Sequence, residues 1–240
     1  MRGEAGRTSD DDDELFTDAL GRLKEDGCAL LLVGSVPDDA NSRACRRMLG
    51  KSTTESRQRV LVFTDATRRD VDERLPAGHT HAAAANAAVV KHTPAARTAV
   101  SQSSAPSATG PSLDGLSERN VDGDDVSELG AAVVETVAEL KGDRGTLDTA
   151  ELRVCLDSLS PLLEAYDEAD VFRFVHVLAH LVCTEDGIFH AHLPLEPSAR
   201  MAHLFRPLFD AVVELRMCEG YPQQRWHLPV EDVDTDWLPL

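Results

Sequence analysis

The feature that most constrains the fold is a series of short, mostly apolar runs separated by helical patterns. Three of them are CALLLVG at 28–34, RVLVFTD at 59–65 and ELRVCLDSL at 151–159. Continuous apolar runs of this length are typical of strands that are buried on both faces. Such strands need helices on both sides of their sheet. The pattern therefore predicts an α/β three-layer sandwich with a mostly parallel central sheet.

The other elements follow from local periodicity and turn residues. Further strands are predicted at 87–92 and 187–195, and an antiparallel hairpin at 211–217 and 223–228. The stretch WHLPVEDVDTDWLPL that follows is expected to fold back on the sheet. Helices are predicted at 14–25, in the turns before Gly50, and at 67–75, 124–141, 170–183 and 197–209, the last with Pro197 in its first turn.

Composition suggests how the chain is divided. Residues 1–13 are polar and end in four aspartates, which predicts a disordered acidic tail. Residues 95–120 are rich in Ser, Ala, Thr, Gly and Pro, which predicts a flexible excursion. We expect residues 14–240 to form one domain that contains this excursion. Two separate domains are the alternative.

The charge is strongly negative. Asp and Glu number 42 against 24 Lys and Arg, which gives a formal charge of −18, and only four of the basic residues are Lys. This balance argues against binding to nucleic acid or to an anionic membrane. Molar salt would screen the self-repulsion, so the composition favours a protein of a high-salt cytoplasm. An ordinary acidic protein is the alternative.

No targeting signal is evident in the sequence. The polar first residues lack the apolar region of a secretory signal, and no apolar stretch has the length of a membrane span. We expect a cytoplasmic protein without contact to membranes.

Three segments carry a family resemblance. LLLVGSVPDDANSR is a strand that ends in Gly34 and leads into a helix, and RVLVFTDATRRDVDERL is a strand that ends near Asp65. LRVCLDSLSPLL is an apolar strand that ends in Asp157 and Ser158. In this order the segments resemble RecA-like ATPases of the KaiC type, with Asp65 in the place of the catalytic glutamates. The whole is also similar to uncharacterised haloarchaeal proteins with a decayed RecA-like core.

The phosphate-binding loop departs from the family pattern. A working loop reads G-x-x-x-x-G-K-[ST], whereas this chain reads GSVPDDAN from Gly34. Asp39 replaces the second glycine, Ala40 the lysine, and Asn41 the Ser or Thr. Asp38 and Asp39 place two carboxylates where a polyanion would bind, and they suit the N-terminus of the following helix. We therefore expect no ordinary ATP hydrolysis, no cofactor and no catalytic residue.

These observations predict a pseudo-ATPase domain that acts in regulation, signalling or protein assembly, through a protein partner or self-association. A weakly active or metal-dependent nucleotide-binding enzyme using Asp65 and Asp157 is one alternative, and a purely structural subunit is another. The residues assigned to a vestigial nucleotide site are Gly34, Ser35, Asp39, Asn41, Asp65, Asp157 and Ser158.

Cysteine and histidine give weaker signals. The five cysteines are scattered without a CxxC pair, which predicts small buried hydrophobes and no zinc ribbon. His176 and His180 are spaced i,i+4 on one predicted helix, and His190 and His192 share one face of a predicted strand. A zinc site from these side chains is possible in principle. We favour satisfied core or interface histidines and expect no metal.

Overall fold

One mixed sheet runs through the middle of the molecule. The computed structural model describes residues 9–50, 57–64, 71–75, 86–93, 116–142 and 145–240. In this part of the chain the strands are β1 (Cys28–Val33), β2 (Gln58–Phe63), β3 (Ala87–His92), β4 (Ser117–Val121), β5 (Leu152–Leu156), β6 (Ile188–Leu193), β7 (Ala211–Cys218), β8 (Tyr221–Leu228), β9 (Val233–Asp234) and β10 (Leu238–Pro239). The helices are α1 (Ser9–Glu25), α2 (Asp38–Leu49), α3 (Val71–Arg74), α6 (Val126–Lys141), α7 (Ser160–Ala165), α8 (Glu168–Thr184), α9 (Arg200–Phe205) and the 3₁₀ turn η2 (Arg206–Leu208).

The strand order is β10-β8-β7-β1-β6-β5-β2-β3-β4, with β9 beside β8. All pairings from β7 across to β4 are parallel, and those of β8 with β7, β9 and β10 are antiparallel. This arrangement confirms the predicted mostly parallel sheet and its C-terminal hairpin. The last residues pair with β8 through β9 and β10, as expected for a segment that folds back on the sheet.

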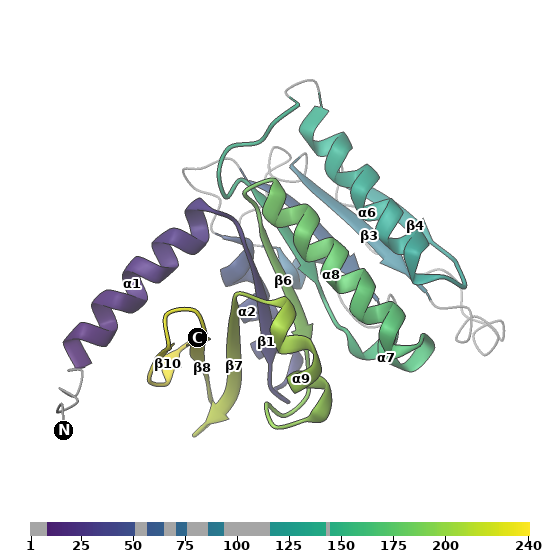
Figure 1. Ribbon diagram of the computed structural model, residues 1–240. Coiled ribbons are helices and arrows are strands. Elements are labelled where there is room, and N and C mark those ends of the chain that lie inside the picture. Colours follow the sequence, from purple (N-terminus) through teal and green to yellow (C-terminus); the bar gives the residue numbers. More distant parts are fainter. Residues whose placement is uncertain (1–8, 51–56, 65–70, 76–85, 94–115, 143–144) are drawn as a thin grey trace.

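Helices cover both faces of the sheet (Figure 1). On one face α6 and α8 run side by side and share a core with α7 and α9. On the other face α1 packs beside β7 and β8, and α2 packs over β5 and β6. Side chains alternate between the two faces along each strand. On β5, for example, Val154 and Leu156 enter the core under α8, whereas Cys155 points toward α2.

Three local expectations were wrong. α1 begins at Ser9, so residues 9–13 belong to a helix and not to a tail. β4 occupies residues 117–121, which overlap the predicted excursion. This strand escaped prediction because SERNV is polar and lies at the sheet edge, where it pairs with β3 through its backbone. Pro197 lies in a turn, and α9 begins only at Arg200. Residues 1–8 and 94–115 lie outside the described residues.

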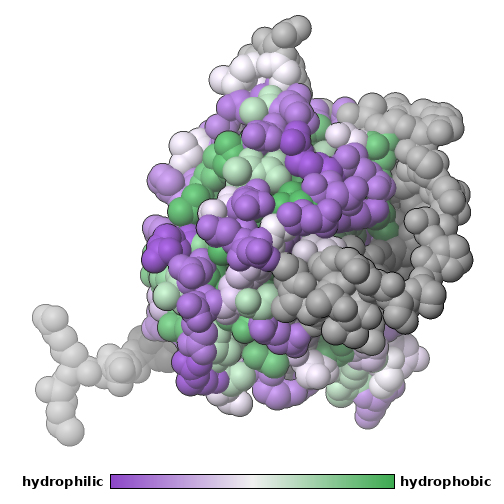
Figure 2. Space-filling model, turned by 90° about the vertical axis from the view of Figure 1, so that its right-hand side faces the viewer, coloured by the Kyte–Doolittle hydropathy of each residue, from purple (hydrophilic) through white to green (hydrophobic). Residues whose placement is uncertain are grey.

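Figure 2 shows one side of the molecule, where hydrophilic residues predominate and hydrophobic ones lie between them. Among the described helices, none combines the length and the apolar character that crossing a membrane requires.

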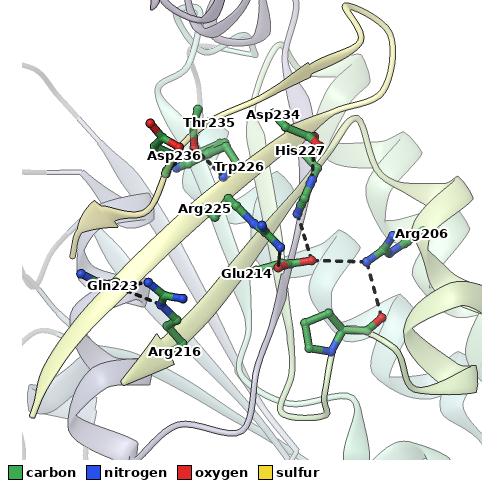
Figure 3. Close-up of polar contacts among 11 residues, drawn as sticks. Arg206, Glu214, Arg216, Gln223, Arg225, Trp226, His227, Asp234, Thr235 and Asp236 are labelled. Atoms are coloured by element: carbon green, nitrogen blue, oxygen red, sulfur yellow. Dashed lines mark hydrogen bonds and ion pairs between the residues drawn. The ribbon is translucent and has the colours of Figure 1, made fainter. Parts of the chain in front are cut away.

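A buried carboxylate fixes the hairpin to its neighbours (Figure 3). Glu214 of β7 pairs with Val33 at the end of β1. Its carboxylate lies 2.6 Å from Arg225 Nη2, 3.6 Å from Arg206 Nη2 and 2.9 Å from His227 Nε2. The Glu214 side chain is 7% exposed, against 36% for Arg225. An almost buried charge is thus compensated from β8 and from η2, which ties three elements together.

We predict that Glu214→Gln lowers the free energy of unfolding by about 1–3 kcal/mol, because it leaves partly buried cations without their carboxylate. The control is Glu135→Gln, which breaks an exposed pair with Arg119 and should cost about 0–1 kcal/mol. Urea unfolding at constant salt measures both. Equal losses for the two variants would contradict the prediction.

Candidate functional site

The loop between β1 and α2 is the place where the resemblance puts a phosphate. Gly34 has φ +136°, and a Cβ at this position would lie 2.2 Å from the carbonyl oxygen of Leu215 on β7. Only glycine fits such a conformation and such a close approach. Packing of the loop against β7 therefore accounts for Gly34, independently of any phosphate.

The chain closes this loop with its own hydrogen bonds. Val36 N donates to Gly34 O at 3.2 Å, and the carbonyl of Pro37 accepts from Ala40 N at 3.0 Å and from Asn41 N at 3.1 Å. The side chain of Asn41 donates from Nδ2 to Val36 O at 3.3 Å. Asn41 is buried, so its amide serves the loop and does not face a ligand.

Charge at the start of α2 is negative and faces solvent. Asp38 and Asp39 form the first turn of α2 and are exposed, as is Ser35 in the loop. Pro37 precedes the helix, and no side chain caps it with a hydrogen bond. These carboxylates therefore make no capping hydrogen bond, but their negative charge interacts favourably with the positive end of the helix dipole. Ala40, which takes the place of the lysine, is 1% exposed.

Asp157 follows β5 and is 1% exposed. Its Oδ1 accepts from the backbone N of Thr64 at 2.9 Å and from Thr64 Oγ1 at 3.1 Å. The same hydroxyl lies 2.6 Å from Ser158 O. Ser158 Oγ accepts from Ser160 N at 3.3 Å, at the first residue of α7. These two side chains thus form hydrogen bonds with a neighbouring loop and with the start of the next helix.

Parallel pairing brings the two halves of the site to one edge of the sheet. β6 pairs with both β1 and β5, so their carboxyl ends, which lead to Gly34 and to Asp157, share that edge. Asp65, also assigned to the site, lies outside the described residues. Thr64 was missed, because a threonine at a strand end carries no signal of its own.

Arg74 of α3 is a further residue that sequence reasoning missed. It is 1% exposed, and neither terminal nitrogen of its guanidinium has a hydrogen-bond partner among the described residues. Burial alone would lower the pKa of Arg74, but its electrostatic interactions with Cys45, Cys155 and Asp157 raise it above its ordinary value. A buried cation therefore faces the sheet beneath α2.

The histidines do not form the single cluster that was considered. His176 and His180 are exposed on α8, whereas His190 and His192 are buried on β6. The latter two lie with Cys45 and Cys155 in one buried group. Sequence alone could show that His190 and His192 share a face, but not which side chains the strand pairing and α2 would bring to them.

Comparison with known proteins finds similar solved structures and one family. None of the curated proteins matches the chain. A KaiC-like protein from the hyperthermophilic archaeon Pyrococcus horikoshii is 11% identical, with a TM-score of 0.46, over 85% of this chain and 78% of that one. The model of DUF7504, a family of unknown function, matches residues 27–215. These residues run from the start of β1 into β7 and include the whole candidate site. The chain therefore belongs to the family DUF7504.

Proposed function

We propose that this chain is a RecA/KaiC-like pseudo-ATPase domain, which acts in regulation, signalling or protein assembly in a high-salt cytoplasm. One observation carries the proposal. The loop after β1 leads into α2, whose first turn has two exposed carboxylates, Asp38 and Asp39. The next residue is the buried Ala40, at the position where a nucleotide-binding loop needs lysine.

Electrostatics make this loop unsuited to a nucleotide. The lysine of a working loop neutralises β- and γ-phosphate charge, and alanine supplies none. A phosphate at the N-terminus of α2 would meet Asp38 and Asp39 instead. At a separation of about 4 Å and an effective dielectric constant near 20, each such contact costs roughly 4 kcal/mol before screening by salt. Salt reduces this repulsion without changing its sign.

The hydrogen bonds of the site point the same way. In a working loop the backbone N–H groups approach the phosphates. Here Ala40 N and Asn41 N donate to Pro37 O, and the Asn41 side chain donates to Val36 O. Asp157 accepts two hydrogen bonds from Thr64. Two side chains assigned to the nucleotide site, Asn41 and Asp157, thus serve contacts within the chain.

We predict that the protein neither binds ATP at micromolar concentrations nor hydrolyses it. Equilibrium titration with labelled ATP and Mg²⁺ in molar KCl, followed by a phosphate-release assay, measures both properties. Asp38→Asn/Asp39→Asn, which removes the local repulsion, should still show no turnover, because no lysine is present. Saturable micromolar binding with turnover by the unmodified protein would refute the proposal.

A lysine at position 40, where the phosphate-binding loop of RecA-like ATPases has one, should not restore nucleotide binding. Ala40 is buried, so Ala40→Lys forces an ammonium group into the core and should lower the free energy of unfolding by about 2 kcal/mol or more. The matched control is Asp39→Lys at the exposed neighbouring position, which should change stability little. Urea unfolding and ATP titration of both variants provide the test. The prediction would be contradicted if the Ala40→Lys protein kept its stability and bound ATP.

Salt should stabilise the fold, because the formal charge of −18 repels itself at low ionic strength. Raising KCl from about 0.1 M to about 1 M shortens the Debye length from about 10 Å to about 3 Å. A gain of about 2 kcal/mol would raise Tm by about 4–8 °C. Thermal unfolding across this range checks the effect, with an uncharged osmolyte at equal osmolality as the control. An unchanged or lower Tm in KCl would contradict adaptation to high salt.

A further inference from the structure

Four buried side chains with metal-binding atoms meet under α2. They are Cys45 of α2, Cys155 of β5, and His190 and His192 of β6. Each is at most 3% exposed. One ligand atom from each, the two sulfurs and one nitrogen of each ring, lies within 4.8 Å of all the others.

The topology of the sheet explains why they meet. Cys155 and His190 are directly paired across β5 and β6. His192 lies two residues further along β6, so it points to the same face as His190. That face is the one that α2 covers, and Cys45 is on the buried side of α2. Residues 45, 155 and 190–192 are thus far apart in the sequence and adjacent in the fold.

The histidine rings in this group have no hydrogen-bond partner. All four of their nitrogen atoms are buried and unpaired among the described residues. Buried polar atoms are nearly always paired, so four unpaired nitrogens in one place require an explanation. The two ring centroids are 5.5 Å apart, and the two sulfurs 3.2 Å apart. A neutral imidazole has one nitrogen with a free lone pair, which can bind a metal ion.

We propose that Cys45, Cys155, His190 and His192 bind one Zn²⁺ ion in a closed tetrahedral site. Two thiolates and two imidazoles are a ligand set of structural zinc sites, which have four protein ligands and no open position for water or substrate. The complete burial of the four side chains fits a closed site. The ion would bind one nitrogen of each ring, which accounts for two of the four unpaired nitrogens.

The charges nearby suit such an ion. Two thiolates balance the charge of Zn²⁺, so the occupied site is neutral. The guanidinium of Arg74 faces Cys45 and Cys155. Its unpaired N–H groups can donate to thiolate sulfur, as outer partners of metal ligands do.

Zinc at this position would act on the fold and would not need nucleotide. The ligands come from α2, β5 and β6, so the ion would hold the helix that follows the β1 loop against the centre of the sheet. The proposed zinc site consists of these four side chains alone. It can therefore be tested whether or not the protein binds ATP.

The main competing state is a disulfide between Cys45 and Cys155. Their sulfurs are 3.2 Å apart, longer than the bond of about 2.05 Å in a disulfide. Forming that bond would release two protons and two electrons to an external oxidant, and it would leave the histidine nitrogens unpaired.

The first test uses the full chain, purified without chelators under reducing conditions in molar KCl. Elemental analysis should find about one zinc ion per chain, and a thiol-blocking mercurial should release it to a colorimetric zinc indicator. The zinc content of Cys45→Ser and of His190→Gln should each be lower than that of the wild-type protein by about tenfold or more. Cys28→Ser, at a buried cysteine outside the group, and His176→Gln, at an exposed histidine, are the matched controls and should retain it.

A second measurement does not depend on the folding of variants. Wild-type protein loaded with Co²⁺ should show visible bands of tetrahedral cobalt and a near-ultraviolet thiolate-to-cobalt charge-transfer band, and Zn²⁺ should displace both. The proposal fails if the wild-type protein holds no stoichiometric zinc and shows no such cobalt spectrum. It also fails if Cys45→Ser and His190→Gln keep their zinc, or if mass spectrometry finds a Cys45–Cys155 disulfide in the reduced preparation.

Discussion

Burial of the central strands on both faces is the constraint on which the rest of this structure depends. β1, β6 and β5 lie in the middle of the sheet, and every residue of each strand is buried. A polar side chain in such a place has no access to bulk water, so it must be paired within the protein or by a ligand. The few polar residues in and beside these strands are therefore more informative than the many exposed charges, because each buried polar side chain needs an identifiable partner.

The buried polar residues differ in whether they have such a partner. Glu214, beside the end of β1, is compensated by cations from β8 and η2. Asp157, beyond the end of β5, accepts hydrogen bonds from Thr64. Both residues are explained by contacts within the chain. His190 and His192 lie between them on β6, and their nitrogens have no partner in the described structure. This contrast within one sheet is why we assign a ligand to the histidines and none to Asp157.

The sequence could predict whatever depends on local pattern. The apolar runs located β1, β2, β3 and β5 within one or two residues at their starts, because strands buried on both faces are continuous in the sequence. Polar β4 went undetected, since its pairing with β3 is made by the backbone. Thr64, Arg74 and the group around His190 were missed because strand register and helix packing, which no local pattern reveals, bring them together.

Both proposals concern helix α2. Its first turn presents Asp38 and Asp39 to solvent, where they disfavour a phosphate, and its buried side presents Cys45 to the sheet. Gly34 packs on Leu215, and Pro37 and Asn41 close the loop with hydrogen bonds of the chain itself. The proposed zinc ion beneath the same helix would add a permanent link between α2 and the sheet, which a nucleotide that is bound and released cannot provide. A helix held in this way would present one constant surface, which suits the proposed role in protein assembly.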